Sequence, residues 1–215
     1  TLLKLAGGLE EPDTGSCTKA NHVVIRYLSQ TPEFDDSCTV WEHVEKKISE
    51  STQWDMEGEA KSMLQTLGIV RLEQKISELS GGQRKRLALA EILMQPCDIL
   101  VLDEPTNHLD HAMEAWLEDY LKRWRGSLIM VTHDRYFLDS VSNRIVEIDK
   151  GKIYSYDTNY SGFLELKAQR EEMEAATERK RQSILRVELE WVKRGARARS
   201  TKQKARLERY EEMRK

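Results

Sequence analysis

The stretch Asp98–Asp110, DILVLDEPTNHLD, contains the most informative pattern in this 215-residue chain. Its unbroken apolar run from Ile99 to Leu102 is typical of a parallel strand buried on both faces. Two carboxylates, Asp103 and Glu104, follow at once, and ligands of open α/β sheets bind at the carboxyl ends of strands. One acid could hold Mg²⁺ while the other activates a water. A strand-end turn with two exposed acids would show the same residues.

A second stretch, ELSGGQRKRLALAEIL at 78–93, precedes the first. Ser80 stands before two glycines and a helical pattern. Gly81 and Gly82 would let backbone N–H groups approach an anion, and the helix N-terminus adds about half a positive charge. A phosphate would suit that position. The plainer interpretation is a serine-capped helix after a glycine turn.

Strands and helices alternate through residues 1–160, which predicts an α/β fold with a mostly parallel sheet covered by helices. His133 follows a second apolar run and would lie on the same sheet edge as Glu104 if the two strands are neighbours. A lone histidine or glutamine at such a place is more often structural or simply exposed. Strands are predicted at 23–30, 99–102 and 127–131, helices at 1–7, 39–48, 57–69, 81–93 and 112–124, and a β-hairpin at 144–156 that turns at Lys150–Gly151.

The sequence pattern changes after Ser161, from alternating strands and helices to one long helical pattern. From Phe163 to about Arg194 the chain predicts one helix of about 48 Å, with apolar residues at intervals of three and four. Gly195 interrupts this pattern, which resumes at 202–213. We expect a long antiparallel helical hairpin over 161–215 with a basic tip at about 191–209, although a plain coiled-coil spacer with solvated charges fits the composition equally well.

Charge divides the chain in the same place. Residues 163–215 hold 16 basic and 10 acidic side chains, a net charge of +6, whereas the whole chain carries −3. Residues 1–162 therefore carry −9. An acidic body with a basic extension predicts two parts with different partners, here 1–160 and 161–215. The three cysteines are scattered and lack metal-binding spacing, which favours a reducing, cytoplasmic setting.

The order of the motifs resembles that of ATP-binding cassette ATPase domains: a strand ending at Gln30, then LSGGQ, then the strand-borne Asp-Glu, then a strand ending at His133. EPTNHLD and the run from YDTNYSGFLELK into a charged helix are similar to the ABC-F family, and the tip is similar to its Uup-like branch. ABC-F proteins carry two cassettes joined by a helical-hairpin linker and have no membrane domain. The resemblance covers essentially the whole chain.

The resemblance implies ATP and Mg²⁺ as cofactors and ATP hydrolysis as the reaction. Glu104 would be the catalytic base and His133 the switch histidine on the γ-phosphate. Asp103 and Gln30 would serve the Mg²⁺ site, and Asp110 would communicate across the cassette pair. The signature residues Leu79, Ser80, Gly81, Gly82 and Gln83 would face ATP held by the second cassette, which is absent here, and Thr1 would lie just beyond the phosphate-loop lysine.

Two departures from the family pattern stand out. The Gly-x-x-x-x-Gly-Lys-Ser/Thr loop is absent, so we expect a fragment that alone binds ATP poorly and is inactive. The segment between Gln30 and Leu79 is short, so an arm that many first cassettes carry there is expected to be reduced or missing.

The resemblance implies a ribosome-associated ATPase whose linker contacts tRNA or rRNA. An ATPase that binds branched DNA is the alternative, and a transporter's ATPase subunit is a third reading that leaves 163–215 without a role. Basic side chains on the tip would meet phosphates with little sequence readout. These are Lys193, Arg194, Arg197, Arg199, Lys202, Lys204 and Arg206.

Overall fold

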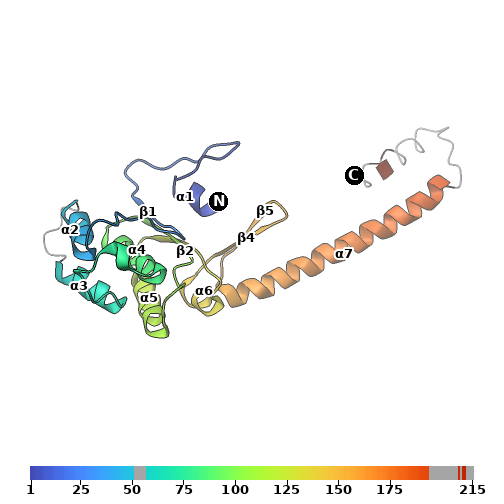
Figure 1. Ribbon diagram of the computed structural model, residues 1–215. Coiled ribbons are helices and arrows are strands. Elements are labelled where there is room, and N and C mark those ends of the chain that lie inside the picture. Colours follow the sequence, from blue (N-terminus) through green and yellow to red (C-terminus); the bar gives the residue numbers. More distant parts are fainter. Residues whose placement is uncertain (51–56, 194–207, 209, 212–215) are drawn as a thin grey trace. The chain divides into compact units, whose positions relative to one another are not determined.

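A computed structural model describes residues 1–50, 57–193, 208, 210 and 211. The chain divides into two compact units, Thr1–Val141 and Ser142–Lys215, which are treated separately below (Figure 1). The division predicted at 160/161 concerns functional domains and stays a prediction. None of the described helices has the length and hydrophobicity that a bilayer span requires.

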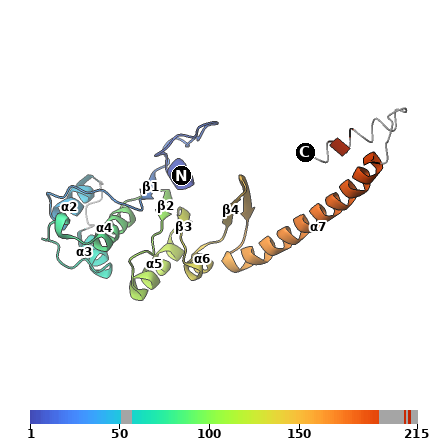
Figure 2. The same cartoon turned by 45° about the vertical axis from the view of Figure 1, so that its right-hand side comes forward.

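The first unit is built on a parallel sheet in the order β1 (Ile25–Leu28), β2 (Ile99–Asp103), β3 (Ser127–Val131), as Figure 2 also shows. Its register pairs Leu28 with Leu102 and Asp103 with Val131. The strands with Asp103–Glu104 and His133 at their ends are therefore neighbours, which confirms the expected α/β fold. The strand predicted at 23–30 is shorter at both ends.

Helices surround this sheet. Helix α4 packs against β1, α2 and α3 pack against α4, α5 packs against α6, and α1 packs against β2 and β3. The helical bounds are α1 Leu2–Ala6, α2 Val40–Glu50, α3 Glu57–Thr66, α4 Gly81–Met94, α5 His111–Arg123 and α6 Arg135–Val141, with a short 3-10 turn, η1, at Ile76–Glu78.

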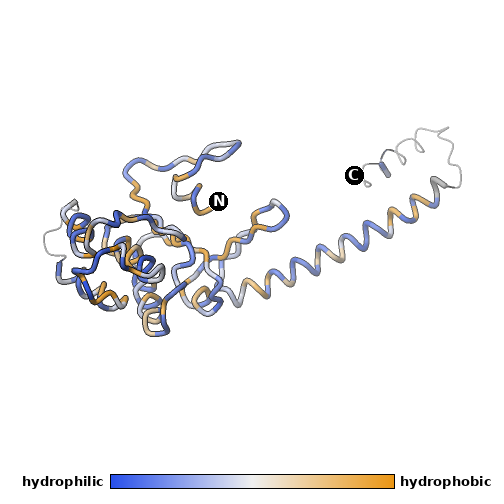
Figure 3. Tube along the Cα trace, in the orientation of Figure 1, coloured by the Kyte–Doolittle hydropathy of each residue, from blue (hydrophilic) through white to orange (hydrophobic). Residues whose placement is uncertain are grey.

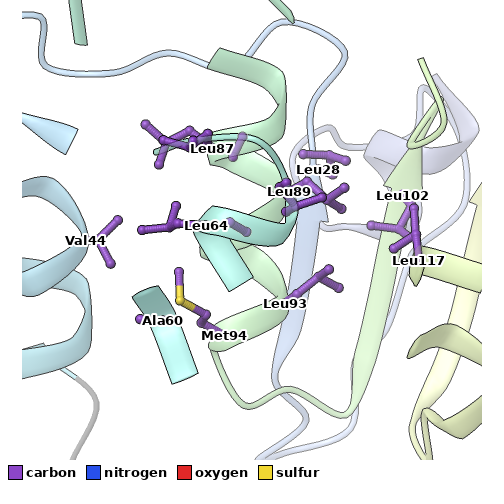
Figure 4. Packing of buried hydrophobic residues seen from close by; sticks show 14 of the residues in the cluster. Leu28, Val44, Ala60, Leu64, Leu87, Leu89, Leu93, Met94, Leu102 and Leu117 are labelled. Atoms are coloured by element: carbon purple, nitrogen blue, oxygen red, sulfur yellow. The ribbon is translucent and has the colours of Figure 1, made fainter. Parts of the chain in front are cut away.

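The core is one cluster of buried residues that extends from the sheet to α4 and α5, and through α4 to α3. Leu64 of α3, Leu89 of α4, Leu102 of β2 and Leu117 of α5 are almost completely inaccessible and belong to one cluster (Figure 4). Burial of a leucine side chain contributes about 1.5–3 kcal/mol. This packing fixes α4 against the sheet, so the start of α4 and the carboxyl ends of the strands belong to one framework.

The sheet is not buried on both faces along its whole width. Strand β3 turns Leu128 and Met130 toward the core, whereas Ile129 and Val131 are 39% and 47% exposed. The prediction that 127–131 is a fully buried strand is wrong on this face. An apolar run shows that a strand can be buried, but other elements decide which faces are covered, and α1 contacts β3 only in part.

The second unit joins a hairpin to a long helix. Strands β4 (Ile145–Asp149) and β5 (Lys152–Tyr156) pair antiparallel, and the two-residue loop Lys150–Gly151 has φ values of 49° and 74°. Two positive φ values define a type I′ turn, for which glycine is well suited. The turn confirms the predicted hairpin.

Helix α7, Tyr160–Lys193, follows as a single helix of 34 residues whose apolar and polar residues alternate along its length (Figure 3). It begins three residues earlier than predicted because the Asn159 side chain accepts a hydrogen bond from the N–H of Gly162 at 3.1 Å. The predicted return helix at 202–213 and the hairpin turn fall largely outside the described residues.

Polar contacts fasten α7 to the hairpin within the second unit. The Glu147 carboxylate on β4 lies 2.5 Å from Lys167 Nζ and 3.0 Å from Arg170 Nη2, and it accepts a hydrogen bond from the hydroxyl of Tyr156 at 3.2 Å. The Arg170 guanidinium also lies 3.7 Å from the ring centroid of Tyr154. The orientation of α7 against β4–β5 is therefore set by charge as well as by packing.

Candidate functional site

The site is built around the chain that leaves β2. Asp103 is the last residue of the strand, and Glu104 follows with a φ of 51°. A glutamate in this left-handed conformation is strained, and such strain gathers at functional sites. The N–H of Glu104 donates to the carbonyl oxygen of Val131 at 2.8 Å, so the turn is tied to the end of β3.

Glu104 and His133 meet across this edge. The main-chain N–H of His133 donates to Glu104 Oε2 at 3.2 Å, and the ring Nε2 of His133 lies 3.5 Å from Oε1. The Glu104 side chain is 9% exposed, whereas that of His133 is 98% exposed. A buried carboxylate is thus oriented by the protein, while the imidazole beside it is free to meet a ligand.

Asp103 is held from the neighbouring strand. The hydroxyl of Tyr27 on β1 donates to Asp103 Oδ2 at 3.3 Å. Burial and the negative charge of Asp103 raise the pKa of Tyr27, which therefore remains a neutral donor at physiological pH. Carboxylate oxygens are the ligands that Mg²⁺ prefers, so the Asp103 carboxylate suits that ion.

The buried polar side chains of the described chain gather at the same place. They are Lys85, Glu104, Thr106 and Thr132. The hydroxyls of Thr106 and Thr132 lie 3.0 Å apart and join the loop after β2 to the loop after β3. Buried polar groups are costly unless they are paired, and their concentration at one edge of the sheet marks a built site.

The sequence interpretation did not identify Lys85, Thr106 or Thr132 as part of this site. Lys85 carries a signal that could have found it, since it lies three and four residues before the apolar Ala88 and Leu89 on the buried side of α4. The two threonines carry no comparable signal.

The start of α4 shows the predicted cap. Ser80 Oγ accepts from the N–H of Gln83 at 3.2 Å, and the Gln83 side chain accepts from the N–H of Ser80 at 2.9 Å. This capping box satisfies two of the free N–H groups of the helix end. The space beside Gly81 is open, whereas a Cβ on Gly82 would lie 3.2 Å from the His108 Cβ. Ser80 is therefore a helix cap, as the plainer interpretation of Ser80–Gly82 predicts, and an anion-binding role for Ser80 stays a prediction.

Among the described residues, the remaining predicted ones form no hydrogen bond or ion pair with Glu104 or His133. Asp110 caps α5 by accepting from the N–H of Met113 at 2.9 Å. Gln30 is exposed and follows β1, and Leu79 is buried at 7% exposure. Thr1 precedes α1 without a side-chain capping bond. The structure thus brings Asp103, Glu104 and His133 together, while the roles of the others remain predictions.

The predicted basic tip is scarcely covered by the structure. Lys193 is the last residue of α7. Arg194, Arg197, Arg199, Lys202, Lys204 and Arg206 lie outside the described residues.

Comparison with protein families agrees with this site. Residues 1–107 match a family model described as ABC transporter, and residues 146–215 match a second model with the same description. An uncharacterized ABC transporter ATP-binding protein, YfmR of Bacillus subtilis, is 42% identical over 98% of this chain and 39% of its own length. The energy-dependent translational throttle protein EttA of Escherichia coli K12 is 35% identical over 99% of this chain and 45% of its own length.

Solved structures give the same family. An archaeal ribosome recycling factor, ABCE1, in complex with a ribosomal stalk protein matches with a TM-score of 0.58 and 28% identity, over 72% of this chain and 30% of that one. A model of ribosome-bound archaeal Pelota and ABCE1 matches with a TM-score of 0.57 and 26% identity, over 72% and 27%. The chain belongs to the ATP-binding cassette family, in its ABC-F group.

The chain spans less than half of the length of YfmR and EttA. The match to YfmR extends over 248 positions, more than the 215 residues of this chain, so that relative carries extra residues within the matched region. This agrees with a shortened arm between Gln30 and Leu79 without locating the difference, and the shortened arm stays a prediction.

Proposed function

We propose that this chain supplies the first cassette and the linker of an ABC-F ATPase that acts on the ribosome, with 1–160 as the cassette and 161–215 as the linker. The observation that supports hydrolysis most directly is the contact between Glu104 and His133 beside Asp103. A buried carboxylate with fixed orientation next to an exposed imidazole suits a general base beside a phosphate-binding group.

In this proposal each residue has a separate task. Glu104 accepts the proton of the attacking water, and its orientation is set by the N–H of His133. The exposed ring of His133 contacts the terminal phosphate of ATP. Asp103 and Gln30 hold Mg²⁺, which neutralises developing phosphate charge when bound. The signature at Leu79–Gln83 faces ATP on a second cassette, and Asp110 links the two.

Three observations support the ribosome as the proposed site of action. EttA is by name a translational throttle protein, and its similarity covers nearly the whole of this chain, including α7. The ABCE1 matches come from a ribosome recycling factor and a ribosome-bound complex. The net charge of +6 over residues 163–215 provides the attraction for RNA phosphates. We propose a cytoplasmic location accordingly.

The test uses Glu104→Gln in the full-length protein. We expect phosphate release to fall at least about a hundredfold, because the water loses its base, while ATP affinity stays within about threefold. Glu73→Gln, an exposed change of the same kind, is the control. Because Glu104→Gln would bind ATP without hydrolysing it, this variant should co-sediment with ribosomes in an ATP-dependent manner.

Two results would contradict the proposal in different parts. Unchanged turnover of Glu104→Gln would remove the assignment of the base. If Glu104→Gln binds ATP without hydrolysing it, does not co-sediment with ribosomes and binds branched DNA in an ATP-dependent manner, the ATPase assignment stands and DNA replaces the ribosome as its target.

A further inference from the structure

Lys85 is a buried charge that none of the roles above uses. It is the fifth residue of α4 and is 5% exposed. Among the described residues, the buried charged side chains are Lys85 and Glu104. Burying an ammonium group is costly unless a partner compensates it, whereas a methionine would fill such a place at no comparable cost. Packing alone therefore does not account for a lysine here.

The partners of Lys85 are the main chain and the acids of the site. Its Nζ donates to the carbonyl oxygen of Asp103 at 3.3 Å. Burial lowers the pKa of Lys85, and the charges of Asp103 and Glu104 act in the opposite direction. As an ammonium, Lys85 brings a positive charge near two adjacent carboxylates, and a charge of that sign reduces their mutual repulsion.

Helix α4 connects this contact to the signature. Ser80 caps the helix, and Lys85 follows five residues later, a rise of about 7.5 Å. Further contacts join the same helix to the loop that follows Glu104, since Arg86 Nη1 donates to the carbonyl oxygen of His108 at 3.4 Å. Gly82 lies against the side chain of the same histidine. The helix that starts at the signature therefore supports the carboxylate turn at two points.

We propose that Lys85 is a positioning residue for hydrolysis, which holds the main chain at Asp103 and so keeps Glu104 in its contact with His133. The proposal rests on the proposed ATPase function. Lys85 touches neither ATP nor the water in this account. It acts through the main chain of Asp103, and it connects the signature helix to the turn that carries the catalytic carboxylate of the same cassette.

The experiment compares Lys85→Met with Lys85→Arg in the full-length protein. Loss of one charge-assisted hydrogen bond should lower kcat about tenfold in Lys85→Met, while KM for ATP stays within about twofold. Lys85→Arg keeps the charge and should stay within about threefold of wild type. Arg84→Met removes a positive charge from the preceding residue, which pairs with Asp36, and should leave kcat unchanged.

A second measurement needs no ATP. The N–H of Glu104 is bonded to Val131, so its hydrogen exchange reports whether the turn is held. We expect faster exchange at Glu104 in Lys85→Met than in wild type, Lys85→Arg or Arg84→Met, with the thermal midpoint of all four within a few degrees. Should Lys85→Met not fold, Lys85→Gln, which keeps a donor without the charge, takes its place.

Two outcomes would overturn the inference. One is wild-type kcat and Glu104 exchange in Lys85→Met. The other is an equal loss of kcat, ATP affinity and thermal stability in Lys85→Met and Lys85→Arg, which would show a merely structural lysine. Failure of the ATPase proposal is recognised separately by unchanged turnover in Glu104→Gln, because Glu104 exchange is measured without nucleotide.

Discussion

Both carboxylate oxygens of Glu104 are engaged by His133: the main-chain N–H of His133 donates to Oε2 at 3.2 Å, and its ring Nε2 lies 3.5 Å from Oε1. The first contact belongs to the backbone and the second to the side chain. Orientation of the acid and contact with a ligand can therefore be separated by mutation at one residue.

Replacing His133 with alanine removes the ring and keeps the N–H. We predict that full-length His133→Ala loses at least about tenfold in kcat, because the contact with the terminal phosphate is lost. The free energy of unfolding should change by less than about 0.5 kcal/mol, since the side chain is 98% exposed. Phosphate release and urea unfolding measure the two quantities. A variant that is destabilised in step with its loss of activity would contradict the separation.

Ser80 has two possible tasks, capping α4 and contacting phosphate, and aspartate separates them. Aspartate caps a helix about as well as serine, so we predict that the free energy of unfolding of Ser80→Asp lies within about 0.5 kcal/mol of the wild-type value. Its negative charge would repel a phosphate, and turnover of the full-length protein should fall strongly. Urea unfolding and phosphate release test this.

The matched change is Ser80→Ala, which removes the capping box and should cost about 0.5–2 kcal/mol. If Ser80→Asp hydrolyses ATP at the wild-type rate, Ser80 is a cap alone.

Much of this site could be predicted from the sequence, because the carboxyl ends of neighbouring parallel strands lie at the same edge of a sheet. Asp103 and His133 each follow an apolar run, and the pairing of β2 with β3 brings their loops together. Lys85 was missed because the helical pattern was used to find apolar residues rather than a charge among them. Thr106 and Thr132 could not have been found, because their contact depends on the conformations of two loops.

The exposed face of β3 shows the other limit. The run at 127–131 is as apolar as that of β2, yet Ile129 and Val131 are exposed. The apolar residues of a strand show that it can be buried. Whether its faces are covered depends on other elements, which the sequence of the strand does not reveal. The early start of α7 has a local cause, the capping side chain of Asn159, which the spacing of apolar residues from Phe163 onward does not reveal.

The base of α7 should be sensitive to acid. The hydrogen bond from Lys167, with the charges of Lys167 and Arg170, holds the pKa of Glu147 below its usual range. A carboxyl group with a depressed pKa in the folded state stabilises it above the unfolded pKa of about 4.3, and this contribution is lost as the pH falls through the folded value. We predict lower protection factors in β4 and β5 below about pH 4, after the exchange rates are corrected for the intrinsic pH dependence of amide exchange.

Glu147→Gln should lower the protection factors of these strands at pH 7 and remove most of their further decrease on acidification. Glu172→Gln, an exposed change on the same helix, should behave as wild type. An acid response that is identical in Glu147→Gln and wild type would show that another group is responsible.

The last prediction concerns the basic tip, which lies outside the described residues. Neutralising Arg197, Arg199 and Lys202 with glutamine in the full-length protein should weaken binding to ribosomes or RNA. It should also reduce the slope of log K against log salt by about two to three, because each lost phosphate contact releases about one counterion fewer. The matched variant changes Arg179, Lys180 and Arg181, three exposed charges on α7. An equal reduction in both variants would mean that net charge, rather than the position of the tip, controls binding.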